Sequence, residues 1–234
     1  MYFGMFDPTF IILIPAILFA LYAQSKINSA YNKYAKIRNR RNLTGAQAAR
    51  MILNQNGLSD VAIEISKGKL SDHYDPKHRI MRLSPDVYSG ATVASVSIAA
   101  HESGHAIQHA ERYSPLVIRN VIVPVVNIAS MLSWPLLIIG ILVISAGNFV
   151  QGNLVFNLGI LFFLAVIVFH TVTLPVEFNA SSRARKQLAD LGILYEEESK
   201  GAKKVLSAAA MTYIAALAVA VANLVRILLI RGRE

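Results

Sequence analysis

The segment His101-Glu-Ser-Gly-His105 contains the side chains best suited to chemistry. Residues four apart share one face of a helix, so the two imidazoles converge on one point, and Glu102 stands beside it. Imidazole and carboxylate are zinc ligands, and the chain has no cysteine to offer instead. A zinc ion lowers the pKa of bound water to roughly 7, and Glu102 can take the released proton. The motif therefore predicts one Zn²⁺ per chain with Glu102 as general base.

The third ligand must come from elsewhere in the sequence. His109 shares the helix face, but it lies eight residues from His101, about 12 Å along a helix, which is too far for one ion. We expect His109 to be a polar residue at the helix end. Glu177 is the first candidate because it follows a 57-residue uncharged run, where a buried carboxylate is costly unless it is paired. Weaker candidates, which lie among charged or turn residues, are Asp60, Glu64 and Glu111.

Four uncharged stretches are long enough to cross a bilayer, for which a helix needs about 20 apolar residues. They are residues 8–25, two stretches within 120–176 separated by a polar turn at 147–153, and residues 205–225. The composition agrees, since 54% of residues are hydrophobic and 16% are charged. A cleaved signal peptide is the alternative for the first stretch, but residues 1–6 lack the required Lys or Arg. The chain is therefore expected to be a mainly α integral membrane protein with about four transmembrane helices.

The positive charges indicate how the chain is oriented. Residues 26–119 carry 14 of the 23 Lys and Arg residues, and residues 183–204 carry six more. The positive-inside rule places both segments in the cytoplasm and the N-terminus outside. Three arginines after the fourth stretch disagree, and they favour a tilted or short helix there; they are Arg226, Arg231 and Arg233. The basic run Tyr31–Arg41 is better explained by lipid headgroups than by nucleic acid.

The first charged segment predicts a small α+β part. Thr44 and Gln47 have the spacing of a capping box, which starts a helix that Gly57 ends. Residues 61–65 and 79–83 alternate in polarity, which predicts a short β-hairpin or strand pair. The motif itself lies on a helix of about twenty residues over 89–111.

These patterns divide the chain into an anchor, a cytoplasmic part, two spans, a ligand-bearing helix and a last span with its tail. The corresponding residues are 1–25, 26–115, 116–176, 177–204 and 205–234. Only about ten apolar residues, Ala91–Ala100, precede His101, which is too few to span a membrane. We therefore expect catalysis at the membrane surface.

Four motifs occur in a fixed order between the apolar stretches: LSDHYDP, LSPDVY, HESGHAIQHA and LPVEFNASSRA. This order resembles the YugP-type membrane zinc metallopeptidases over nearly the whole chain. That family is similar to the HtpX and CAAX prenyl endopeptidase group of gluzincins, whose site combines HExxH with a downstream Glu on a second helix. The resemblance implies zinc ligands at His101, His105 and Glu177, with Glu102 as the base.

The resemblance also implies a function. The protein would cleave membrane-associated proteins or peptides at the cytoplasmic face of a bacterial plasma membrane, with the substrate extended along residues 80–83. The number of copies in the assembly is left open. The alternative is a catalytically inactive scaffold or chaperone adaptor that keeps the fold. His170 lies two helical turns before Glu177, and it either lines the cleft or bonds to a neighbouring helix.

Other positions are candidates for supporting roles. In the wider group an acidic residue follows the ligand Glu by four positions, whereas Ser181 stands here, with Asn179 nearby. Either side chain can accept a hydrogen bond from an imidazole N–H. A donor to the developing oxyanion is also expected. The candidates are His73, Tyr74 and Tyr88, unless these are merely turn and strand residues.

Overall fold

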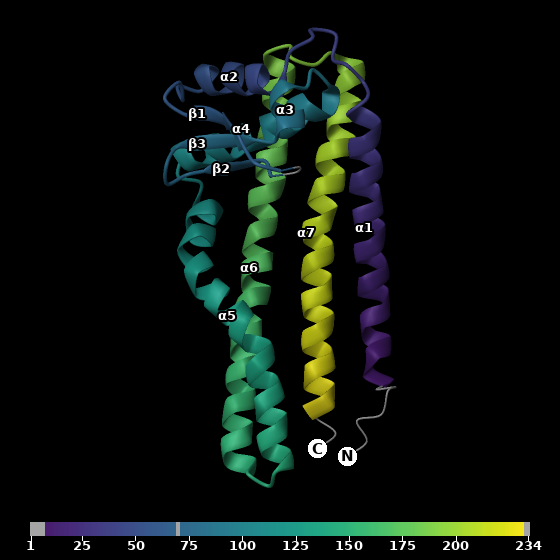
Figure 1. Ribbon diagram of the computed structural model, residues 1–234, viewed down its shortest axis with the longest axis vertical. Helices are drawn as coiled ribbons and strands as arrows, with labels where there is room; N and C mark the ends of the chain where they lie inside the picture. The colour runs from purple at the N-terminus through teal and green to yellow at the C-terminus, as the bar shows by residue number, and fades with distance from the viewer. Residues whose placement is uncertain (1–7, 69–70, 232–234) are drawn as a thin grey trace. The chain divides into compact units, whose positions relative to one another are not determined.

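The computed structural model describes residues 8–68 and 71–231, and helices dominate it (Figure 1). The chain divides into two compact units. The span unit contains residues 8–22, 118–174 and 213–231, and the sheet unit contains residues 23–117 and 175–212. In chain order the elements are η1 (Pro8–Ile12), α1 (Leu13–Tyr34), α2 (Gly45–Gln55), β1 (Ala62–Ile65), β2 (His73–Asp75), β3 (Ile80–Leu83), α3 (Pro85–Ser89), α4 (Val93–Ala110), α5 (Ser114–Ser145), α6 (Phe149–Asp190) and α7 (Glu196–Arg231).

Four helical segments are long and apolar enough to cross a membrane, which confirms the mainly α class with four spans. They are Pro8–Tyr34, Ser114–Ser145, Phe149–Asp190 and Glu196–Arg231. Each helix extends beyond the uncharged stretch that predicted it. Charged residues mark where a helix leaves the lipid, whereas the helix continues as long as its backbone hydrogen bonds do. The expected segment 177–204 accordingly holds the end of α6 and the start of α7. Residues 1–7 of the expected anchor lie outside the described residues.

Within the span unit, α5 and α6 run side by side and are joined by a short turn (Figure 1). Gly147 has φ +89°, a left-handed conformation that glycine adopts without strain. A Cβ on Gly140 would lie 2.7 Å from the backbone nitrogen of Phe156, so the absence of a side chain lets the two backbones approach. A small core forms from Leu137, Phe156, Phe163 and Ile227.

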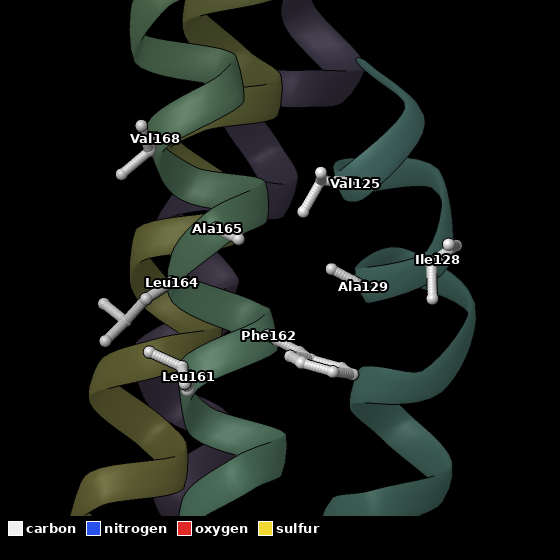
Figure 2. A pocket seen from close by; sticks show the side chains of 8 residues that line it. All are labelled: Val125, Ile128, Ala129, Leu161, Phe162, Leu164, Ala165 and Val168. Carbon is white, nitrogen blue, oxygen red and sulfur yellow. The ribbon is translucent and has the colours of Figure 1, made fainter. Parts of the chain in front are cut away.

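Helix α5 bends along its length, and it contains Pro124 and Pro135 (Figure 1). Proline removes a helical hydrogen bond and kinks the chain. An apolar groove lies between α5 and α6, with side chains from both helices on its walls (Figure 2). It is lined by Val125, Ile128, Ala129, Leu161, Phe162, Leu164, Ala165 and Val168. A wholly apolar lining suits a surface that meets lipid chains.

The arginines that conflict with the charge rule have partners inside the span unit. The guanidinium of Arg226 lies 3.9 Å from the ring centroid of Phe10. Arg231 donates a hydrogen bond to the side-chain oxygen of Asn157 at 2.5 Å. Arg233 lies outside the described residues. These contacts show how positive charge is accommodated at the end of α7.

The sheet has the order β1-β3-β2, which confirms the expected strand pair but not the hairpin alternative for these two segments. β1 and β3, the two alternating segments, do pair, but they run parallel, with Ala62 opposite Ile80. The antiparallel hairpin is formed by β2 and β3, with Tyr74 opposite Met81. Alternation predicts a strand but not its direction, and β2 is too short and polar to show the pattern. Because β3 is central, its two edges are paired, and the expected substrate path along residues 80–83 is not available.

The helices of the sheet unit start where their caps lie. Thr44 and Gln47 form both bonds of the predicted capping box, with N···O distances of 2.9 and 3.2 Å. α4 begins at Val93, four residues later than expected, because Thr92 caps it by accepting a bond from the Ser95 N–H. The residues before it form the short helix α3. The core between the elements includes Ile52, Leu53, Met81, Leu83, Val96, Ala100 and Leu188.

Candidate metal centre

Helix α4 and the end of α6 approach each other closely at Gly104. A Cβ at this position would lie 2.6 Å from the carbonyl oxygen of Ala180, a distance that real Cβ atoms do not show. Glycine is therefore required for the backbones to come this near. Glu177 lies one turn before Ala180 on α6, so this approach brings it towards the imidazoles on α4.

Three side chains converge at the crossing of α4 and α6. Oε2 of Glu177 lies 3.2 Å from Nε2 of His101 and 3.6 Å from Nε2 of His105. The two imidazoles meet edge to face, with centroids 4.7 Å apart. The nitrogen and oxygen atoms all lie within 4.8 Å of one another. In residues 8–68 and 71–231, this is the only such group of three or more His, Cys, Asp or Glu side chains.

The hydrogen bonds around the imidazoles suit a cation. Nδ1 of His105 lies 3.0 Å from Oε1 of Gln108, and Nδ1 of His101 lies 3.2 Å from the Ser181 hydroxyl. With the protons on Nδ1, both Nε2 atoms carry lone pairs directed at a carboxylate oxygen, an arrangement that a cation relieves. In a zinc tetrahedron with bonds near 2.0–2.1 Å, ligand atoms are about 3.3 Å apart. The observed separations from Glu177 bracket that value, so the donor set fits Zn²⁺.

The centre is largely shielded from water. The side chains of His101, His105 and Glu177 are 16%, 12% and 5% exposed. Glu102, beside the first histidine, is also buried. Burial raises the pKa of Glu102 to about 7, against a smaller opposite effect from His101. A cation at the centre would lower that pKa again.

The other candidate carboxylates have arginine partners. The pairs are Asp60 with Arg79 at 2.6 Å, Glu64 with Arg82 at 3.3 Å, and Glu111 with Arg183 at 2.6 Å. All three carboxylates are at least half exposed. Ion pairing at the surface accounts for each of them without a metal. Glu177, in contrast, is buried against two imidazoles.

The structure separates the two residues expected to support an imidazole. Ser181 lies against His101, as described above. Asn179 does not contact an imidazole, because its Oδ1 accepts hydrogen bonds from Gln108 at 3.0 Å and from Arg183 at 2.7 Å. Sequence reasoning missed Gln108, which contacts His105. Its position three residues after a motif histidine was the available signal, since i and i+3 are neighbours on a helix.

The remaining candidates lie at other places. The hydroxyl of Tyr74 lies 3.0 Å from Nδ1 of His109, which is in the last turn of α4, as expected. His73 is exposed, and its Nδ1 contacts a backbone carbonyl two residues earlier at 2.8 Å. Tyr88 packs against the core of the sheet unit. His170 belongs to the span unit, where its ring centroid lies 5.9 Å from that of the preceding phenylalanine.

Comparison with known proteins places the chain in a family. Residues 9–232 match the family model described as "Putative neutral zinc metallopeptidase". The chain is 46% identical over 223 residues to the "Putative membrane protease YugP" of Bacillus subtilis (strain 168), and this match covers 94% of the chain and 96% of that protein. No solved structure matches the chain significantly. With four apolar helices and a family match over nearly its whole length, the chain belongs to this family of membrane zinc metallopeptidases.

Proposed function

We propose that the protein is a gluzincin-type zinc endopeptidase that cleaves membrane-associated proteins at the cytoplasmic surface of a bacterial plasma membrane. One zinc ion per chain would be held by His101, His105 and Glu177. The observation that carries this proposal is the convergence of two Nε2 atoms and one carboxylate oxygen, from helices far apart in the sequence, beside the buried Glu102. Membership of a zinc metallopeptidase family supports the choice of metal and of reaction class.

The metal and Glu102 would have different functions in peptide hydrolysis. When bound, zinc supplies a Lewis acid that polarises the scissile carbonyl and makes water nucleophilic near neutral pH. Glu102 accepts the proton that the attacking water loses, and it then delivers this proton to the nitrogen of the leaving amine. The shielding of the site strengthens these electrostatic interactions.

The substrate requires a strand edge, and the sheet order leaves β2 and β1 at the edges. β2 lies beside the site helix, since Tyr74 on β2 contacts His109 on α4. An extended peptide can add to such an edge through its main chain. We therefore assign the substrate to β2.

Zinc content tests the proposal most directly. The purified full chain is expected to contain about one zinc per molecule by atomic emission, since three protein ligands hold a single catalytic ion and leave its fourth position to water or substrate. His105→Ala is expected to lose the metal. His78→Ala is the matched control, because His78 bonds to Asp75 and lies outside the cluster. A wild-type protein without zinc would overturn the enzymatic proposal and favour a scaffold.

Glu177→Gln is expected to weaken zinc binding by more than the roughly 10- to 100-fold typical of lost outer partners, because a negative ligand disappears. The fold should persist, since glutamine fills the same space. Chelator competition measures the dissociation constant, and circular dichroism checks the fold. Glu64→Gln and Glu111→Gln serve as controls that keep wild-type affinity. If one of these lost zinc while Glu177→Gln kept it, the third ligand would be reassigned.

The orientation can be tested because the chain has no cysteine of its own. Asn148→Cys, in the turn between α5 and α6, is expected to react with an impermeant thiol reagent applied to intact cells. Lys200→Cys, an exposed position near the start of α7, is expected to react only after lysis. The reverse labelling pattern would place the metal centre outside.

A further inference from the structure

Gln108 is a fully buried polar side chain that takes no direct part in the proposed chemistry. Its Oε1 lies 3.0 Å from Nδ1 of His105. Its Nε2 donates to the backbone carbonyl of Val176 at 2.8 Å and to Oδ1 of Asn179 at 3.0 Å. A glutamine amide has two N–H donors and one carbonyl acceptor, so both of its ends are engaged. Gln108 thus joins α4 to α6 directly beside Glu177.

The orientation of this amide is fixed by its partners. Arg183 can only donate, so the atom of Asn179 that receives its bond at 2.7 Å is the oxygen. The carbonyl of Val176 can only accept. Both acceptors therefore face the NH₂ group of Gln108, and this leaves Oε1 towards His105. The hydrogen bonds that Arg183 and Gln108 donate therefore allow only one orientation for the side-chain amides of Asn179 and Gln108.

A fixed amide oxygen fixes the imidazole. Because Oε1 only accepts, Nδ1 of His105 carries a proton, and in the neutral imidazole Nε2 then carries the lone pair that faces Glu177. His101 has no such constraint, since its partner Ser181 is a hydroxyl that can rotate to donate or to accept. The two histidines of the motif are therefore held differently.

We infer that Gln108 is a positioning residue, which holds His105 in the tautomer whose Nε2 binds the ion. The inference rests on the proposed zinc site, and it assigns to Gln108 the role that a carboxylate or backbone carbonyl has beside most metal-binding histidines. The bonds to Val176 and Asn179 keep the amide from turning over. Metal affinity then depends on a side chain that never touches the metal.

Two substitutions distinguish the two functions of Gln108, which are to accept the hydrogen bond of His105 and to link α4 to α6. Gln108→Leu removes both functions, and it is expected to raise the zinc dissociation constant of the full chain in nanodiscs by about 10- to 100-fold. Gln108→Glu keeps an acceptor for His105 but loses the donor to α6. It is expected to bind zinc about as tightly as the wild type while unfolding at a lower temperature. Gln187→Leu is the matched control, because Gln187 bonds to Asn56 away from the centre.

The inference fails if Gln108→Leu leaves zinc affinity unchanged, or if Gln108→Glu weakens it as much as Gln108→Leu does. Nitrogen-15 NMR of the His105 ring in the wild type decides the question even if a variant does not fold. The proton of the neutral ring is expected on Nδ1 both with and without zinc, and a neutral ring with its only proton on Nε2 would overturn the inference. A wild type that binds no zinc would refute the proposed function, whereas the tautomer would still test Gln108.

Discussion

Glu102→Gln is expected to cleave a labelled unfolded protein, such as casein, about 10²- to 10⁴-fold more slowly than the wild type while keeping its zinc. The glutamine amide fills the same volume, but it cannot accept a proton from water. Glu102 contributes none of the three converging ligand atoms, so the ion should stay. The side chain is buried, and a neutral amide costs less to bury than a charged carboxylate, so the fold should not suffer. Cleavage rates and zinc content, measured on the same samples, check the prediction.

The matched control is Glu196→Gln, the same change at an exposed glutamate in the first turn of α7. It is expected to retain the wild-type rate and zinc content. If Glu102→Gln cleaved casein at the wild-type rate with its zinc in place, another group would have to be the base. If it lost both zinc and activity, Glu102 would be supporting the ion and not the proton transfer.

The features that the sequence predicted best depend on local periodicity and on charge. The spacing of His101 and His105 sets a shared helix face before any tertiary contact is known. The four spans follow from uncharged length, which the bilayer thickness converts into helices. Glu177 was selected because a carboxylate at the end of a long uncharged run needs a partner, and the structure supplies two imidazoles. Each of these signals lies within one continuous stretch of chain.

The missed features depend on how distant segments meet. β1 pairs with β3 in parallel, and alternation within each strand does not encode the relative direction of two strands. In the sequence, Gln108 is simply a polar residue near the end of a helix. Its burial comes from contact with α6, about 70 residues further along the chain. The three side chains that converge at the centre and the partner of His101, Ser181, were predictable, whereas the contacts of Gln108 with His105 and α6 were not.

Gly104→Ala is expected to lower zinc affinity strongly, although helix propensity alone favours alanine by about 1 kcal/mol. The new Cβ would meet the carbonyl oxygen of Ala180 at 2.6 Å and its carbonyl carbon at 3.2 Å. These are backbone atoms and cannot turn aside, so α4 and α6 must separate. Overpacking costs about 1–3 kcal/mol, and if zinc binding bears this cost, the dissociation constant rises roughly 5- to 150-fold. Chelator competition measures it.

Gly45→Ala is the control that distinguishes displacement of a metal ligand from general destabilisation of the sheet unit. Its Cβ would meet the carbonyl oxygen of Val87, a still closer backbone contact at the start of α2. It is expected to lower the unfolding temperature while the folded protein binds zinc normally. Equal loss of zinc in both variants would mean that any overpacking damages the centre. Loss in Gly104→Ala alone would mean that the distance between α4 and α6 sets the metal geometry, because zinc ligands tolerate displacements of only about 0.2 Å.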